Sequence, residues 1–375
     1  MNFTVSSSQL SSRLQTISRV IGSKNPIPVL GSILFELHGN TLTLTASSTD
    51  NTLNTSLEVV ECSEDFSFAI SARILIDSLK EISEQPLRFE VNKDTLEVNV
   101  LYLNGKYSMV AYNADEYPSP VVLGEDSVSI SVPACLLANG ISCSLFATAG
   151  EDADRRFMSC VYFDFDPESI TLVATDGHKL ARYRDCSVQG AEKSAFILPK
   201  KPSTLLKTLL SKDDEEEVQI EFDGRFAIFS MGEYKLISRL HDGRYPKYNS
   251  VIPQNNPHKL TVDRVALVSA LRRVSIFSSQ ASIVKLHIED NKIIVSAQDT
   301  DFSTSAEESI TCSYDGVPMN IGFRAMFLID ILNNIPVQDV IFELADPSRA
   351  GVIVPAEQIE KQELLMLIMP MTLTE

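Results

Sequence analysis

The chain has 375 residues, and its 50 Asp and Glu against 32 Lys and Arg give a formal net charge of −18. Hydrophobic residues make up 44% and charged residues 22%, as in ordinary globular proteins, and no apolar window is long enough to predict a transmembrane helix. The first residues lack the basic-then-apolar pattern of a signal peptide. The six cysteines are dispersed without a C-x-x-C pair, which predicts reduced thiols in a cytoplasmic protein.

The chain begins with a strand-like segment and a helix whose apolar residues recur at spacings of three and four, within residues 3–21. The same order returns at 128–145 and at 259–274. Val5, Val132 and Val262 occupy equivalent places, at steps of 127 and 130 residues. Because one third of the chain is 125 residues, the spacing predicts three copies of one unit.

A second strand and helix follow inside each copy, about 61 to 66 residues after the first, at 68–82, 196–210 and 319–332. Alternating apolar residues predict strand pairs between the two helices and after the second one. The pairs are 33–37 with 41–45, 160–165 with 169–174, 283–288 with 292–297, 87–91 with 95–101, 218–222 with 226–230, and 339–344 with 351–354. Each unit is therefore predicted to be α+β, with two helices and about eight strands.

Proline-rich segments at 117–120 and 253–257 predict linkers between the copies. The domains expected from them are 1–122, 126–254 and 255–375. The acidic run at 213–217 is expected to be a solvated loop.

Charge is distributed unevenly along the chain. Six predicted helical windows (8–24, 72–85, 133–147, 199–212, 263–277 and 323–334) hold 13 basic and 5 acidic residues, a net charge of +8. The remaining residues therefore carry −26. Helix propensity favours Glu as much as Lys, so propensity alone does not explain the excess. If the helices share one face, that face is basic and can bind phosphate backbones without sequence preference.

One segment has the residues for acid–base chemistry. Asp176 and His178 follow a predicted strand, and Cys160 or Cys186 could serve as a nucleophile, which would make a hydrolase-type site. The alternative is that Asp176-Gly177 forms a tight turn with His178 at its tip. We favour the turn, because no third partner or nucleophile elbow is visible.

Other motifs of catalysis are missing from the sequence. The five histidines have no zinc-ligand spacing, and there is neither a GxGxxG nor a phosphate-binding GxxxxGK[ST] segment. We therefore predict no cofactor, no metal and no enzymatic activity. Near the end, the apolar run 364–371 predicts a core strand, and the Met369-Pro370-Met371 segment after it suits an adaptable apolar groove for peptides.

The segment 172–181, Leu-Val-Ala-Thr-Asp-Gly-His-Lys-Leu-Ala, resembles the most characteristic segment of the bacterial DNA polymerase III beta subunit, the sliding clamp. Supporting matches occur in order along the whole chain. They lie at 3–5, 28–31, 242–246 with Tyr248 and Pro253, 321–323 and 369–371.

The resemblance implies a head-to-tail homodimer that closes as a six-domain ring, with helices lining the hole and strands forming the rim. Such a ring encircles duplex DNA without sequence specificity and acts as a processivity factor with no catalysis of its own. The implied partners are the replicative polymerase subunit, the clamp loader and repair proteins, which bind through short linear peptides; no membrane is implied. An enzyme of the Asp176/His178 type and a scaffold that never meets DNA are the alternatives, and the basic helices argue against the scaffold.

The resemblance also implies two sets of site residues. The peptide-binding groove would use Met158, Thr175, Gly177, His178, Lys179, Leu180, Pro246, Val251, Phe327, Leu367, Ile368, Met369, Pro370 and Met371. The DNA-facing residues would be Lys24, Lys80, Arg155, Arg156, Phe157, Lys200 and Lys201. Ser250 and Arg324 depart from the family pattern, and the tail 372–375 is longer than usual, so the peptide preference is expected to differ.

Overall fold

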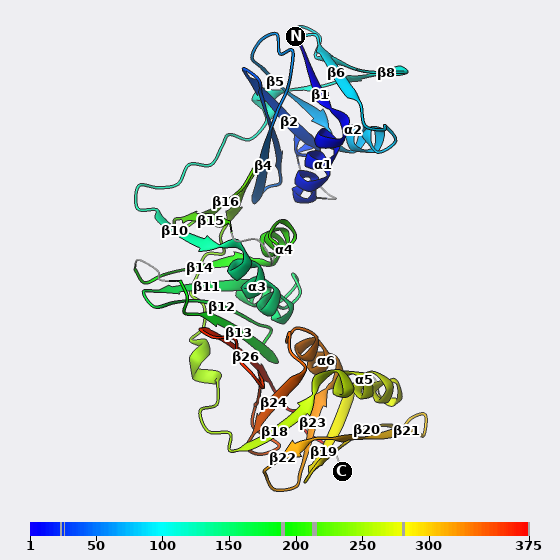
Figure 1. The fold of residues 1–375 in the computed structure, drawn as a ribbon, viewed down its shortest axis with the longest axis vertical. Helices are drawn as coiled ribbons and strands as arrows, with labels where there is room; N and C mark the ends of the chain where they lie inside the picture. Colours follow the sequence, from blue (N-terminus) through cyan, green and yellow to red (C-terminus); the bar gives the residue numbers. More distant parts are fainter. Residues whose placement is uncertain (23–24, 26, 189–191, 212–215, 280–281, 374–375) are drawn as a thin grey trace. The chain divides into compact units, whose positions relative to one another are not determined.

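The computed structural model describes residues 1–22, 25, 27–188, 192–211, 216–279 and 282–373 (Figure 1). The chain divides into two compact units, one of Met1–Ala134 with Asp214–Leu240 and one of Cys135–Asp213 with His241–Glu375. No helix among the described residues is long and apolar enough to cross a membrane.

The first unit contains a four-stranded antiparallel sheet in the order β1-β6-β7-β8. Its strands are β1 (Asn2–Ser6), β6 (Pro86–Val91), β7 (Glu97–Tyr102) and β8 (Gly105–Val110). Side chains alternate between the two faces of each strand, so Phe3 and Phe89 lie on the buried face, where their rings stack at 4.7 Å between centroids.

The same unit contains a nine-stranded sheet in the order β10-β15-β16-β17-β4-β3-β2-β5-β9. Its strands are β2 (Ser32–His38), β3 (Thr41–Ser47), β4 (Asn51–Glu58), β5 (Phe66–Ser71), β9 (Tyr112–Asn113), β10 (Val128–Pro133), β15 (Glu217–Phe222), β16 (Phe226–Met231) and β17 (Tyr234–Arg239). Pairing of β17 with β4 makes one sheet out of strands that are almost 180 residues apart, since Tyr234 faces Thr55 and Ser238 faces Asn51.

Two helices cover these sheets, α1 (Ser7–Ile17) and α2 (Ala72–Leu79), which pack against each other. The Ser6 hydroxyl caps α1 by accepting a hydrogen bond from the Gln9 amide. Leu10, Leu14 and Ile17 recur at helical spacing and are fully buried. Short 3₁₀ turns lie at Ser18–Val20, Pro28–Gly31 and Ala114–Glu116.

The second unit also has a nine-stranded sheet, in the order β14-β11-β12-β13-β26-β25-β24-β18-β22. Its strands are β11 (Cys160–Asp166), β12 (Ser169–Thr175), β13 (Lys179–Asp185), β14 (Ser194–Pro199), β18 (His258–Asp263), β22 (Ser313–Tyr314), β24 (Asp339–Leu344), β25 (Gly351–Pro355) and β26 (Gln362–Ile368). Here β13 pairs with β26 along seven residues, from Lys179 facing Ile368 to Asp185 facing Gln362.

A four-stranded sheet in the order β21-β20-β19-β23 completes the second unit. Its strands are β19 (Ile283–Glu289), β20 (Lys292–Asp299), β21 (Thr304–Thr311) and β23 (Met319–Arg324). The helices α5 (Arg264–Val274) and α6 (Ala325–Asn333) pack against each other beside it (Figure 1). The helices α3 (Ala134–Ser144) and α4 (Lys200–Leu209) belong to the middle repeat, and further 3₁₀ turns are η4 (Leu145–Ala147), η5 (Arg156–Ser159), η6 (Tyr248–Val251) and η7 (Ser275–Phe277).

The predicted repeat is confirmed. In the part of the chain that the structure describes, the order is three times one strand, one helix, four strands, one helix and three strands, which gives eight strands and two helices in each repeat. The short strands β9 and β22 are additions to this plan. The second helix of the first repeat is shorter than predicted and ends at Leu79. Of the acidic run expected to be a loop, residues 213–215 lie outside the described residues, and Glu217 instead begins β15.

Some of the basic residues on the helices bind other groups of the same protein. Arg13 forms an ion pair with Glu233 and lies 5.2 Å from the ring centroid of Tyr234. Arg264 donates to the carbonyl oxygens of Val337 and Leu332 at 2.6 and 3.3 Å, and Arg273 pairs with Glu308. The unpaired basic charge on the helices is therefore smaller than the sequence tally of +8.

Candidate functional site

The segment between β12 and β13 forms a tight turn held by its own polar side chains. One oxygen of Asp176 accepts hydrogen bonds from the amides of His178 and Lys179, each at 2.9 Å. The Thr175 hydroxyl donates to the Lys179 carbonyl at 2.7 Å and accepts from the Gly177 amide at 3.1 Å. Gly177 has φ +88°, a left-handed conformation that favours glycine, so the turn needs glycine here. The His178 side chain is left exposed at the tip.

Lys179 fixes this turn to helix α6. Its side chain is 6% exposed, and its ammonium nitrogen lies 2.6 Å from the second oxygen of Asp176 and 4.4 Å from the ring centroid of Phe327. Burial raises the pKa of Asp330 on α6, an effect that Lys179 opposes and the Asp176 carboxylate strengthens. A buried ammonium is stable only with such partners, so Lys179 supports the turn from below and does not face solvent.

This arrangement does not support a hydrolase-type site with Asp176 and His178 as acid–base pair and Cys160 as nucleophile. The Asp176 carboxylate is engaged by two backbone amides and the Lys179 ammonium, while the His178 ring packs against Phe327 at 5.6 Å between centroids. Burial raises the pKa of the Cys160 thiol to about 12, which keeps it protonated and unreactive at neutral pH. Among the described residues, no three His, Cys, Asp or Glu side chains gather as metal ligands would.

The chain after β26, Met369-Pro370-Met371, forms a lip beside the turn. The Met369 amide donates to the His178 carbonyl at 2.8 Å, and two residues later the Met371 amide donates to the Gly322 carbonyl on β23, also at 2.8 Å. Met369 is 43% exposed, and Pro370 and Met371 are half-buried. The lip thus presents flexible apolar side chains on a backbone held at two points.

The fourteen predicted groove residues differ in their exposure to solvent. Five are exposed, namely Gly177, His178, Pro246, Val251 and Met369. Five are half-buried, namely Met158, Thr175, Phe327, Pro370 and Met371. The other four, Lys179, Leu180, Leu367 and Ile368, are buried. Leu180 and Leu367 face each other across β13 and β26 and pack with Val173, Ile252 and Ala350, so they support the surface from inside the core.

Sequence reasoning missed an aromatic cluster beside these residues. Tyr162 and Tyr245 stack at 4.6 Å with their rings 3° from parallel, Phe157 meets Tyr245 edge-on, and Tyr248 donates to Asp164 at 2.9 Å. These tyrosines line a hollow of about 540 Å³ that also includes Pro246 and Ser250. The only sequence signal was the spacing of three between Tyr245 and Tyr248 around Pro246.

Arg324, noted as a departure from the family pattern, stacks on the same ring as Lys179. Its guanidinium carbon lies 5.0 Å from the ring centroid of Phe327. The ring is therefore flanked by two cations, which the negative face of an aromatic ring favours.

The predicted DNA-facing residues are in varied surroundings. Lys24 lies outside the described residues. Lys80 is exposed but pairs with Asp77 at 3.0 Å, and Lys200 and Lys201 are half-buried, with the Lys200 ammonium donating to the Ala149 carbonyl at 3.3 Å. Arg155 and Arg156 are exposed, whereas Phe157 belongs to the aromatic cluster.

Fold and site together define a class of protein: three repeats joined by continuous sheets, with an apolar lip beside a rigid turn. Comparison with known proteins agrees. The N-terminal, central and C-terminal domain models of the DNA polymerase III beta subunit match residues 1–121, 131–247 and 249–372. The chain belongs to the DNA polymerase III beta subunit family, the sliding clamps.

Individual relatives are similar over their whole length. The beta sliding clamps of Haemophilus influenzae and Escherichia coli are 27% and 26% identical, with all of each chain covered. A crystal structure of the subunit from Pseudomonas aeruginosa matches with a TM-score of 0.93 at 25% identity, covering both chains fully. The Bartonella birtlesii clamp bound to griselimycin matches with a TM-score of 0.91 at 26% identity, again over both full chains.

Replacing Asp176 with Ala should destabilise the turn and the packing of α6. The variant loses two amide hydrogen bonds and leaves the Lys179 ammonium buried without its closest partner, so the free energy of unfolding should fall by about 2–3 kcal/mol. Urea unfolding followed by circular dichroism measures the change. The matched control is Asp242→Ala in the exposed Asp242-Gly243 turn, which should change the midpoint little; equal effects of both variants would contradict the role given to Asp176.

Proposed function

We propose that the chain is a non-catalytic processivity factor that closes with a second copy into a ring around duplex DNA and tethers the replicative polymerase. Three domains, 1–122, 126–254 and 255–375, form each half of the ring, and the protein works in the cytoplasm. The name of the family and of its relatives, beta sliding clamp of DNA polymerase III, supports this function.

One observation is the main support for the ring. The last strand of a repeat joins the sheet of the previous repeat, and this happens in the same way at two junctions. In the first unit, β17 adds to β4, and in the second unit β26 adds to β13. The two junctions share one register. Leu236 faces Leu53 in one, and Met366 faces Ala181, at the equivalent positions, in the other.

The repeat leaves two strands without this partner. By their position in the repeat, β8 corresponds to β17 and β26, and β21 corresponds to β4 and β13. Both β8 and β21 are the outermost strands of their sheets. If β21 of a second copy paired with β8, the same kind of junction would form a third time. Pairing of that copy's β8 with β21 of the first copy would then close the assembly. Such a contact between different surfaces of two copies closes as a ring when the rotation permits it.

The register of this third junction follows from the other two. Phe3, Phe89, Val100 and Tyr107 face one another in order across β1, β6, β7 and β8, and the equivalent row of the second repeat ends at Leu236. Leu236 faces Leu53, and Ala306 on β21 is equivalent to Leu53. Tyr107 should therefore face Ala306 of the other copy. Lys106 should then face Glu307, which pairs opposite charges. Beside β21, Ile276 and Phe277 of η7 are 78% and 40% exposed, as expected of apolar residues that a second copy covers.

A ring also explains how an acidic protein stays on DNA. With a net charge of −18, the chain cannot rely on strong attraction to phosphates. Exposed cations remain on the helices at Arg73, Lys207 and Arg272, enough for weak contacts to a phosphate backbone. Encirclement makes tight contact unnecessary and permits sliding.

The lip and the turn are proposed to bind short linear peptides of partner proteins. The exposed residues His178 and Met369, with the half-buried Phe327 between the two cations, offer an apolar surface with polar edges. Replicative polymerase, clamp loader and repair proteins would share it. The binding of griselimycin by two related clamps supports a ligand site on this fold.

Retention on DNA tests the ring. After loading by a clamp loader, the protein should remain on nicked circular plasmid in raised salt and be lost from the same plasmid once linearised, because salt weakens contacts but not topological linkage. Gel filtration of the loaded complexes measures this. Equal loss from both DNAs would indicate ordinary electrostatic binding and contradict encirclement.

A charge swap tests the register of the closing junction. Lys106→Glu places like charges opposite each other at both junctions, so the dimer dissociation constant should rise about tenfold. Adding Glu307→Lys should restore it, whereas adding Glu308→Lys, on the other face of β21, should not. Analytical ultracentrifugation measures the constant, and rescue by Glu308→Lys in place of Glu307→Lys would show that the register is wrong.

His178→Ala tests the peptide site. The variant removes the ring that packs on Phe327, so the affinity for griselimycin should fall about tenfold while sedimentation of the dimer stays unchanged. Isothermal titration calorimetry gives the affinity, with His38→Ala, an exposed histidine of the first unit, as the control. Unchanged affinity in both variants would place the ligand elsewhere.

A further inference from the structure

The end of the lip meets the outer edge of β23 at one point, and the chain continues beyond it to Leu373. The Met371 amide hydrogen-bonds to the Gly322 carbonyl, and the two residues form an antiparallel bridge. Because β23 is the outermost strand of its sheet, the tail adds to an edge that would otherwise offer unpaired backbone groups. This is the pairing mode by which extended peptides add to sheets.

Leu373 anchors the tail on the face of this sheet. A Cβ atom at Gly322 would lie only 2.7 Å from Leu373 Cδ2 and 3.0 Å from the Met371 carbonyl oxygen. Glycine at 322 therefore leaves the space that the leucine occupies, and a larger residue there would force the Leu373 side chain or the tail backbone to shift. Leu373 itself is half-buried, although it stands two residues beyond the lip.

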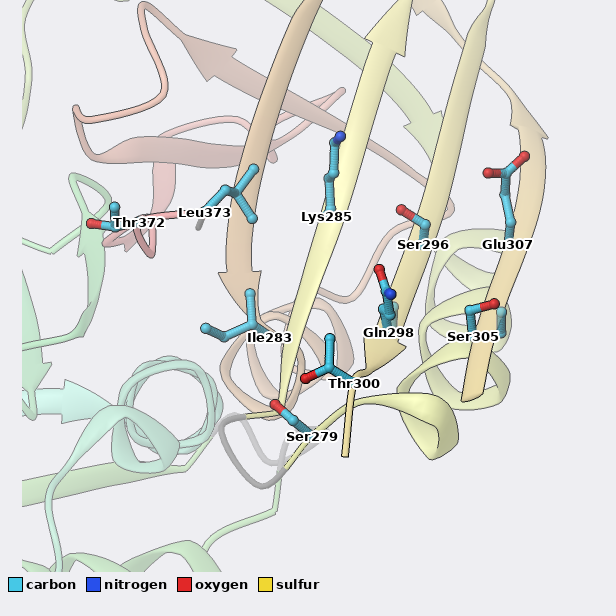
Figure 2. Close-up of a pocket in the computed structure, with 12 residues that line it drawn as sticks. Ser279, Ile283, Lys285, Ser296, Gln298, Thr300, Ser305, Glu307, Thr372 and Leu373 are labelled. Atoms are coloured by element: carbon cyan, nitrogen blue, oxygen red, sulfur yellow. The ribbon is translucent and has the colours of Figure 1, made fainter. Parts of the chain in front are cut away.

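The tail borders two hollows. A hollow of about 520 Å³, shown in Figure 2, is lined by Lys285, Ser296 and Gln298 on the strands and by Thr372 and Leu373 on the tail. A second hollow of about 750 Å³ includes Asn320 and Asp346, and the same two tail residues line it too. The tail therefore borders open space on both sides, and the Leu373 side chain lies against the Gly322 backbone.

We propose that Leu373 is a positioning residue for the peptide site: by packing on Gly322 it holds the Met371 bridge, which in turn fixes the lip Met369-Pro370-Met371. The lip is fastened at one end to His178 and at the other to Gly322. Without the second fastening, a ligand must order the lip itself and binds more weakly for that reason. This inference rests on the proposed peptide site, and it predicts that peptide affinity depends on a residue outside the contact surface.

The test compares Leu373→Ser with Leu373→Met in the full chain, using two measurements. Hydrogen exchange of the Met371 amide in the free protein should speed up at least tenfold in Leu373→Ser and stay near the original rate in Leu373→Met. Calorimetry with griselimycin should show about three- to tenfold weaker binding for Leu373→Ser and near-original binding for Leu373→Met.

Two further variants check the path of the effect. Gly322→Ala disturbs the same contact from the strand side, so it should weaken griselimycin binding to a similar extent. The double variant Gly322→Ala with Leu373→Ser should bind griselimycin no more weakly than either single variant. Thr372→Ala, at the exposed neighbour on the same tail, is the matched control and should change neither measurement.

The outcomes separate this inference from the proposed function. Faster exchange at Met371 with unchanged griselimycin affinity would overturn the positioning role, as would unchanged exchange in Leu373→Ser. If the original protein does not bind griselimycin at all, the proposed peptide site is wrong, and exchange at Met371 then decides by itself whether Leu373 holds the lip.

Discussion

Antiparallel pairing between strands of neighbouring repeats is the interaction on which the rest of this structure depends. The second and third repeats end in β17 and β26, and the open hydrogen-bonding edges of these strands pair with β4 and β13 of the preceding repeats. The inward residues of both junctions are buried, for example Leu53, Leu236, Ala181 and Met366, so backbone pairing and apolar packing act together. Because both junctions have the same register, neighbouring repeats are joined in the same way each time.

The same junction builds the candidate peptide site. Because β13 lies beside β26, the turn that precedes β13 is brought next to the lip that follows β26, about 190 residues later in the chain. Lys179 sits at the start of this junction and connects the Asp176 carboxylate to Phe327 on α6. Sheet continuity and the buried ammonium therefore hold residues of two repeats in one surface.

The repeat, the helices and most hairpins were predictable because apolar periodicity reports them directly. The strands that join the repeats were harder to predict. β4 and β21, for example, are rich in Thr, Ser, Asn and Glu, and polar strands of this kind give little alternating signal. The site was predictable as a set of segments, since the turn and the lip are local motifs. The aromatic cluster and the tail contact on Gly322 were not, because they depend on which strands meet.

By itself the sequence determined the number of repeats, the α+β class, the absence of a recognisable catalytic motif and the segments that form the site. These follow from local periodicity and from residue types at fixed spacing. Only the tertiary structure decided which residues face solvent. It buried Lys179 against Asp176, paired Arg13, Arg264 and Arg273 with other groups of the protein, and placed Leu373 on Gly322. Burial and pairing of charges depend on neighbours from distant parts of the chain, and a linear pattern does not contain that information.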